Sequence, residues 1–211
     1  MNRVKKIEND ISRLTCDPYS IIEHSPDPAL RILHEEVDFQ QIPEEFALVL
    51  WNLAGLKNEK KYPNVLEIGI ATGYSVMVFD HFLDVESFTL IDDGKYHKFD
   101  DHEKVLFGIN YDLFVGDSTS TEAINFVESK NLTFDLIHID ANHLYGYVLQ
   151  DFKNYSEFLS EDGIIILHDS LHLEGPRRVL IETYSLEHGG FKVLCNIGNK
   201  FGSAIIARKG V

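Results

Sequence analysis

The sequence is poor in cysteine and has no long apolar run. Its two cysteines, Cys16 and Cys195, lie far apart without metal-type spacing, so the sequence predicts neither a disulfide framework nor a cysteine-bound metal. No segment approaches the roughly 18 consecutive apolar residues that would span a bilayer. Residues 1–20 mix charges of both signs and lack the apolar segment of a secretory signal. We therefore expect a cytoplasmic protein without a membrane partner.

Cationic residues are also scarce. The 19 Lys and Arg residues compare with 34 Asp and Glu residues, which gives a formal net charge of -15. A surface of this sign repels phosphate backbones, so we expect no nucleic-acid partner and a small molecule as the partner instead. Charge and composition do not decide whether the chain forms a homo-oligomer.

The chain does contain enough apolar residues for one folded domain. Hydrophobic residues make up 44% of the 211 positions, and a chain of this length needs no disulfide or metal to hold its core together. Residues 1–42 are charged and helix-prone, and they predict a helical cap with helices over Arg3–Leu14 and Pro28–Glu36. Residues 43–211 form the main domain, which opens with a predicted helix over Pro43–Asn58.

From Asn64 onward, short apolar runs alternate with helical stretches. Strands that are apolar on both faces and separated by helices indicate a parallel sheet covered on each side. The last two strands are joined by a turn rich in Gly and Asn and predict a hairpin. The predicted fold class is α/β: a doubly wound, mostly parallel seven-stranded sheet with a C-terminal antiparallel hairpin and an N-terminal helical extension. The predicted strands are Asn64–Ile68, Ser87–Ile91, Asp112–Val115, Phe134–Ile139, Gly163–Leu167, Phe191–Cys195 and Ser203–Ala207. The predicted helices within the sheet region are Tyr74–Leu83, His97–Phe107, Thr119–Ser129, Tyr145–Leu159 and Pro176–Glu187.

The loop from Glu67 to Ser75, after the first strand, has the features of a nucleotide-like binding site. Gly69 allows a tight turn and a close approach to the backbone, and the N–H groups that open the next helix attract a carboxylate or phosphate. Two glycines at this spacing also occur in ordinary helix-packing turns. Acidic residues at the ends of the first three strands strengthen the binding interpretation. Glu67 could hold an ammonium group, Asp92 the ribose hydroxyls, and Asp117 with Ser118 an adenine edge.

The chain resembles the class I S-adenosylmethionine-dependent methyltransferases over Pro43–Val211. The glycine pattern, with Ala71 as its middle member, and the terminal hairpin carry this resemblance and separate the chain from dinucleotide dehydrogenases. Gly73-Tyr74-Ser75 is similar to the turn of small-molecule O-methyltransferases, in which the Ser hydroxyl meets the methionine carboxylate. The resemblance implies S-adenosylmethionine as cofactor, bound by Glu67, Gly69, Ala71, Gly73, Tyr74, Ser75, Asp92, Asp117, Ser118 and Asp140.

The fourth and fifth predicted strands end in polar side chains. Asp140 and His143 follow one strand, and His168 and Asp169 end the other, so all four should meet at the carboxyl edge of the sheet. Carboxylates with imidazole suit a hard or borderline divalent cation, and His143 could act as general base near neutral pH. The residues leave open whether a cation binds.

This Asp-x-x-His stretch and the later His-Asp pair are similar to O-methyltransferases that act on sugar hydroxyls of natural products. The resemblance implies magnesium held by Asp140, His168 and Asp169, with His143 and Asp140 as catalytic residues. His168 stands where those relatives usually have Glu, and relatives acting on catechols have Lys at position 143. The alternatives are that Asp140 and Asp169 only cap helices, that the chain is a non-catalytic S-adenosylmethionine-binding module, or that it runs another reaction on the same fold.

Overall fold

The computed structural model describes residues 41–56, 61–185, 190–198 and 200–210. The two helices expected over Arg3–Leu14 and Pro28–Glu36, and all of the expected cap except Gln41 and Ile42, lie outside the described residues. No helix in the described part of the chain is long and apolar enough to cross a membrane.

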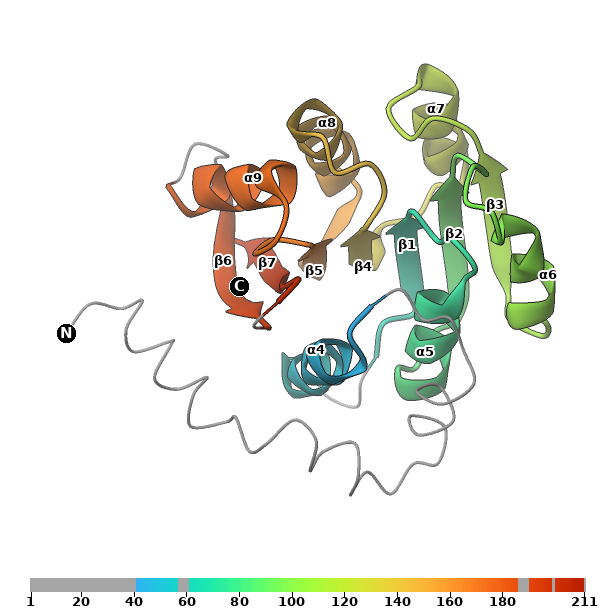
Figure 1. Ribbon diagram of the computed structural model, residues 1–211, viewed down its shortest axis with the longest axis horizontal. Helices are drawn as coiled ribbons and strands as arrows, with labels where there is room; N and C mark the ends of the chain where they lie inside the picture. Colours follow the sequence, from blue (N-terminus) through green and yellow to red (C-terminus); the bar gives the residue numbers. More distant parts are fainter. Residues whose placement is uncertain (1–40, 57–60, 186–189, 199, 211) are drawn as a thin grey trace.

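A seven-stranded sheet forms the centre of the domain (Figure 1), as expected. The strand order is β3-β2-β1-β4-β5-β7-β6, and all neighbours are parallel except that β7 runs antiparallel to both β5 and β6. The strands are β1 (Asn64–Ile68), β2 (Ser87–Asp92), β3 (Tyr111–Val115), β4 (Phe134–Ile139), β5 (Leu159–His168), β6 (Phe191–Ile197) and β7 (Ser203–Arg208).

Helices cover both faces of the sheet (Figure 1). One apolar cluster packs α4, α5 and the η2–α6 segment on one face, with Phe79 among its buried side chains. A second cluster packs α7, α8 and α9 on the other face, around Phe152 and Val179. The helices are α4 (Pro43–Leu56), α5 (Tyr74–Phe82), η2 (Phe99–Asp101), α6 (His102–Val105), α7 (Thr121–Ser129), α8 (Tyr145–Ser156) and α9 (Glu174–Tyr184).

The structure departs from the expected elements mainly in two places, the segment His97–Phe107 and the junction of α8 with β5. The helix expected over His97–Phe107 is only a 3₁₀ turn followed by one turn of α-helix. Few of its apolar side chains reach the core, and Phe107 is 91% exposed. Strand β5 begins at Leu159 rather than Gly163, and α8 ends earlier than expected. The pairing of β4 with β5 shifts register near its start, so the polar residues 160–162 extend the strand instead of the helix.

The strand order reverses between β1 and β4, and the carboxyl ends of these strands open a crevice where ligands of such sheets bind. The Asp140 N–H donates to the carbonyl of Ile68 at 2.8 Å, which ties the β4 loop to the end of β1. Ile139 pairs with Leu167 across β4 and β5. The next residues, Asp140 and His168, therefore meet at the sheet edge as the sequence predicted.

Candidate active site at the carboxyl edge of the sheet

A cavity of about 400 Å³ opens at the carboxyl ends of β1 to β4. Most of the predicted cofactor residues line it. They are Gly69, Ala71, Tyr74, Ser75, Asp92, Asp117, Ser118 and Asp140. The other two predicted residues, Glu67 and Gly73, do not line the cavity. They can contribute to ligand binding only through neighbouring residues.

The glycines of the β1 loop are required mainly by protein packing. Gly69 has a φ of 88°, and a Cβ placed there would lie 2.3 Å from the carbonyl oxygen of Asp140. Gly73 has a φ of 85°, and its Cβ would lie 2.9 Å from the side chain of Leu106. Ala71 also adopts a left-handed conformation, with a φ of 48°. The loop therefore owes its shape to contacts with the β4 loop and with α6 as much as to space for a ligand.

Asp92, predicted to hold the ribose, binds backbone N–H groups of the β1 loop and of its own turn. Its Oδ2 accepts hydrogen bonds from the N–H groups of Ile70 at 2.9 Å and Ala71 at 3.0 Å. Its Oδ1 accepts from the N–H of Gly94 at 2.8 Å. The exposed neighbour Asp93 lines the same cavity. Asp93 was not among the predicted cofactor residues, although it directly follows Asp92 at the end of β2.

Glu67 lies under the loop and is fully buried. Its Oε1 accepts the hydroxyl hydrogen of Ser75 and lies 3.0 Å from Nδ1 of His138. His138 is fully buried too, with its ring edge-on to Phe79. A carboxylate, a hydroxyl and an imidazole are thus linked beneath the wall of the cavity.

The third strand contributes Asp117 and Ser118 to the far end of the cavity. The Oδ1 of Asp117 accepts from the N–H of Thr119 at 2.9 Å, which holds the start of the turn. Tyr155 donates its hydroxyl hydrogen to the carbonyl of Ser118 at 2.5 Å. The position of Ser118 is therefore set from α8, behind the cavity wall.

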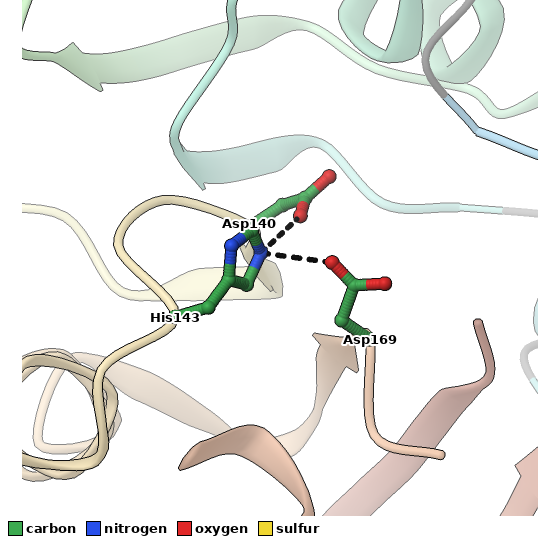
Figure 2. Close-up of side chains that lie close together, drawn as sticks. All are labelled: Asp140, His143 and Asp169. Carbon is green, nitrogen blue, oxygen red and sulfur yellow. Dashed lines mark hydrogen bonds and ion pairs between the residues drawn. The ribbon is translucent and has the colours of Figure 1, made fainter. Parts of the chain in front are cut away.

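Four side chains converge where β4 and β5 end, and we call Asp140, His143, His168 and Asp169 the acid–histidine cluster. The Nε2 of His143 lies 3.3 Å from Oδ1 of Asp140 and 3.0 Å from Oδ2 of Asp169 (Figure 2). The Nδ1 of His168 lies 3.0 Å from Oδ1 of Asp140 and 3.6 Å from Oδ2 of Asp169. The sequence predicted this convergence from the strand ends.

The charges of the acid–histidine cluster balance one another. Burial opposes protonation of His143, but Asp140 and Asp169 outweigh it and raise the pKa of His143 to about 9. The same balance raises the pKa of His168 to about 10. Burial also opposes ionisation of the carboxyls, yet the imidazoles lower the pKa of Asp169 to about 2 and hold the pKa of Asp140 well below its usual range. The ion pairs of the cluster therefore favour the charged forms of both its imidazoles and its carboxyls.

The backbone at Asp169 is strained. Asp169 has a φ of 56°, a left-handed conformation that L residues other than Gly adopt infrequently. The turn directs its carboxylate back toward His143 (Figure 2). Residues held in such conformations concentrate at functional sites.

Gln41 completes the surroundings of Asp140. Its side-chain amide donates to Oδ2 of Asp140 at 3.0 Å, and it lines the same cavity. In the sequence, residue 41 falls in the expected N-terminal cap of residues 1–42, for which no site role is predicted. A single Gln before a helix carries no recognisable signal, and only the packing of α4 against the sheet brings it to the site.

The cluster offers a donor set for a divalent cation. Ligand atoms of Asp140, His143 and Asp169 lie within 4.8 Å of one another, and no other such group of three or more His, Cys, Asp or Glu residues is found in the described parts of the chain. Two carboxylates and one imidazole fit a hard or borderline cation. The set differs from the predicted one, because His143 takes the place of His168.

Solved structures of methyltransferases share this architecture. The O-methyltransferase from Bacillus cereus, solved in complex with SAH, is 15% identical over 92% of this chain and 96% of its own, with a TM-score of 0.70. TomG from Streptomyces achromogenes, an O-methyltransferase of tomaymycin synthesis solved with SAM, is 16% identical over 87% and 91%, with a TM-score of 0.61. The TDP-rhamnose 3'-O-methyltransferase of calicheamicin biosynthesis is 15% identical over 95% and 94%, with a TM-score of 0.56. At these identities the likeness concerns the fold.

The sheet order and the cavity at its carboxyl edge define the class I methyltransferase fold. A family model described as a methyltransferase domain matches residues 66–170, which include the β1 loop and the acid–histidine cluster. Residues 66–170 therefore form a methyltransferase domain, and the fold is that of the class I S-adenosylmethionine-dependent methyltransferases. A search of curated protein sequences found no match.

Proposed function

We propose that the chain transfers a methyl group from S-adenosylmethionine to a hydroxyl oxygen of a small-molecule acceptor. The observation that carries this proposal is the acid–histidine cluster, of which Asp140, His143 and Asp169 line the same cavity as the β1 loop. A methyl donor held by the loop would place its sulfonium near the same residues that an acceptor hydroxyl would meet. The O-methyltransferases among the structural neighbours support the choice of oxygen as acceptor atom.

His143 is the proposed general base. It is partly exposed toward the cavity, whereas His168 is 5% exposed. In the reaction the acceptor oxygen bonds to the methyl carbon, the carbon–sulfur bond breaks, and S-adenosylhomocysteine leaves. The hydroxyl proton passes to the imidazole of His143 when that ring is neutral. Asp140 and Asp169 then stabilise the imidazolium that forms.

The carboxylates of the cluster would also hold a divalent cation. Asp140 and Asp169 would bind it, together with one imidazole, either His143 from the observed set or His168 from the predicted one. When bound, such a cation lowers the pKa of an acceptor hydroxyl and fixes its orientation. His143 cannot coordinate a cation and accept a proton with the same Nε2 at once, so the two roles compete.

The experiment is a transfer assay with labelled S-adenosylmethionine and a panel of sugars, nucleotide sugars, phenols and catechols. Once an acceptor is found, His143→Ala should lower the rate by roughly 10²–10⁴, the usual effect of a positioned acid–base group. The matched control is His97→Ala, because His97 is an exposed histidine outside the cavity lining. The rate is compared with and without a chelator.

The outcomes separate the parts of the proposal. Full activity of the His143→Ala variant would exclude His143 as base, and full activity in chelator would exclude the cation. Donor binding without transfer to any member of the panel would favour a non-catalytic binding module. Transfer to nitrogen or carbon acceptors alone would contradict the proposed acceptor atom.

A further inference from the structure

Glu45 joins the start of α4 to the C-terminal hairpin. The residue is 6% exposed, and its Oε1 accepts a hydrogen bond from the N–H of Lys200 at 2.7 Å. Its Oε2 accepts from the N–H groups of Phe201 at 3.2 Å and Gly202 at 2.9 Å. One buried side chain therefore holds three consecutive N–H groups between β6 and β7. We call residues 200–202 the hairpin turn.

The backbone before the hairpin turn also fits closely around Glu45. Gly198 has a φ of 114°, and a Cβ placed there would lie 2.6 Å from the side-chain carboxyl carbon of Glu45. The hydrogen-bonded partners are 155 to 157 residues apart in the chain. Only the packing of α4 beside β6 and β7 brings them together.

The carbonyl groups of the hairpin turn hold the backbone that follows Asp169. The carbonyl of Gly202 accepts a hydrogen bond from the N–H of Ser170 at 3.2 Å. The carbonyl of Phe201 accepts from the N–H groups of residues 171 and 172 at 2.9 and 3.2 Å. The hairpin turn thus donates to Glu45 on one side and accepts from residues 170–172 on the other.

One peptide group makes both connections. The peptide between Phe201 and Gly202 donates its N–H to Glu45, and its carbonyl accepts from residues 171 and 172. Because a peptide group is planar and rigid, its N–H and its carbonyl cannot turn independently. The hydrogen bond to Glu45 therefore fixes the direction of the carbonyl that holds residues 171 and 172.

Asp169 needs this support because its backbone is strained. Its φ of 56° is left-handed, and such a conformation persists only where the surrounding structure determines it. The aromatic ring of Phe201 lies against His168 and His172, with centroid distances of 6.4 and 5.4 Å. The hairpin turn thus contacts the chain both before and after Asp169.

We propose that Glu45 is a positioning residue for Asp169. Through the hairpin turn it fixes the strained backbone that places Oδ2 of Asp169 3.0 Å from Nε2 of His143 (Figure 2). Glu45 does not line the cavity, so it acts only through other residues. Its effect on catalysis rests on the proposed function, in which Asp169 stabilises the imidazolium of His143.

The test compares the transfer rate at saturating substrates with the affinity for S-adenosylhomocysteine. Glu45→Ala should lower the rate about 10- to 100-fold, the usual effect of losing a group that orients a functional side chain. It should bind S-adenosylhomocysteine within twofold of the parent in isothermal titration calorimetry, because the hairpin turn does not line the cavity. Glu45→Gln keeps the shape and one accepting oxygen, and its rate should lie between those of the parent and the Ala variant.

The matched control is Leu53→Ala, because Leu53 is a fully buried residue of the same helix. This variant should lower the unfolding temperature but keep the transfer rate within twofold of the parent, at a temperature where every variant is folded. An equal loss of rate in Leu53→Ala and Glu45→Ala would reduce Glu45 to a residue of general stability. An unchanged rate in Glu45→Ala would overturn the proposal outright.

Double variants test the route through Asp169. Added to Asp169→Ala, Glu45→Ala should lower the rate by no more than a further twofold, because residues that act as one unit are not additive. Added to Gln41→Ala, it should keep its full effect. Additive losses with Asp169→Ala would overturn the proposal, and so would a loss that disappears only in the Gln41→Ala background.

A spectroscopic measurement tests the same route without an acceptor. At one fixed pH, Glu45→Ala should move the His143 ring signals in ¹H–¹³C NMR spectra in the same direction as Asp169→Ala does, whereas Leu53→Ala should leave them in place. Unmoved His143 signals in Glu45→Ala would refute the positioning role. A parent that transfers no methyl group to any acceptor would refute the proposed function instead, and the His143 signals would still decide whether Glu45 positions Asp169.

Discussion

At the scale of a single residue, the buried surroundings of Asp151 shift the pKa of its carboxyl group. Asp151 lies on α8 and is fully buried. Burial raises the pKa of Asp151 to about 7, opposed by the neighbouring Ser118 side chain and reinforced by the charge of Asp117. A carboxyl group behind the cavity wall therefore changes its charge near neutral pH.

Replacing Asp151 with Asn should change how stability depends on pH. Below pH about 4, the ordinary pKa of Asp, both the folded and unfolded states are protonated and no penalty exists. Between pH about 4 and 7 only the unfolded state releases its proton, so the parent loses stability as pH rises, by up to about 4 kcal/mol. Asp151→Asn should remove this slope, as measured by urea unfolding at pH 5.5 and 8.

The matched control for this prediction is Asp100→Asn, because Asp100 is exposed. That variant should follow the pH dependence of the parent. If Asp151→Asn and the parent lose the same stability between the two pH values, Asp151 is ionised in the folded protein throughout, and the assignment of its raised pKa is wrong.

At the scale of elements, the start of α9 supports the loop that carries His143. A Cβ on Gly175 would lie 2.1 Å from the carbonyl oxygen of His143 and 2.7 Å from the N–H nitrogen of Tyr145. Helices α8 and α9 pack against each other along this contact. No flexible side chain separates the two backbones here, so a methyl group cannot be added without moving one of them.

Gly175→Ala should therefore destabilise the protein by about 1–3 kcal/mol, the usual cost of overpacking, and should shift His143 out of position. Gly146→Ala is the matched control, because Gly146 also lies in the first turn of a helix but has open space around its Cβ position. That variant should be neutral or more stable by about 0.5–1 kcal/mol, since Ala is the better helix former. Urea unfolding measures both, and equal stability of the two variants would contradict the proposed contact.

At the scale of the whole molecule, the cavity draws its walls from loops after β1, β2, β3 and β4. A ligand that contacts several of these loops binds the folded chain and not the unfolded one. Such a ligand stabilises the fold by mass action. The cavity thus links cofactor binding to global stability.

S-adenosylhomocysteine should raise the unfolding temperature. At 100 times its dissociation constant it adds about 2.7 kcal/mol of stability, which corresponds to a rise of roughly 5–10 °C for a domain of this size. NAD⁺ at the same concentration should give no shift, because the β1 loop lacks the dehydrogenase glycine pattern. Differential scanning fluorimetry checks both, and a larger shift with NAD⁺ would contradict the assignment of the cofactor.

Much of the fold could be read from the sequence because its signals are local. Strands such as Asn64–Ile68 and Phe134–Ile139 are short apolar runs bounded by polar residues, and the structure has them at the predicted positions. The weakly apolar segment 97–107 lacked such a signal, and its helical content was overestimated. Polar residues 160–162 joined a strand because β5 pairs with β4, a partner that lies more than 20 residues away.

The sequence by itself determined which side chains end the strands, and hence that Asp140, His168 and Asp169 meet at one edge, because parallel strands present their carboxyl ends together. Tertiary structure alone decided which groups touch. It brought Gln41 to Asp140, joined Ser75 and Glu67 to His138, and set Gly175 against the His143 loop. These contacts join segments far apart in the chain, and their distances depend on how helices and strands pack rather than on any local preference.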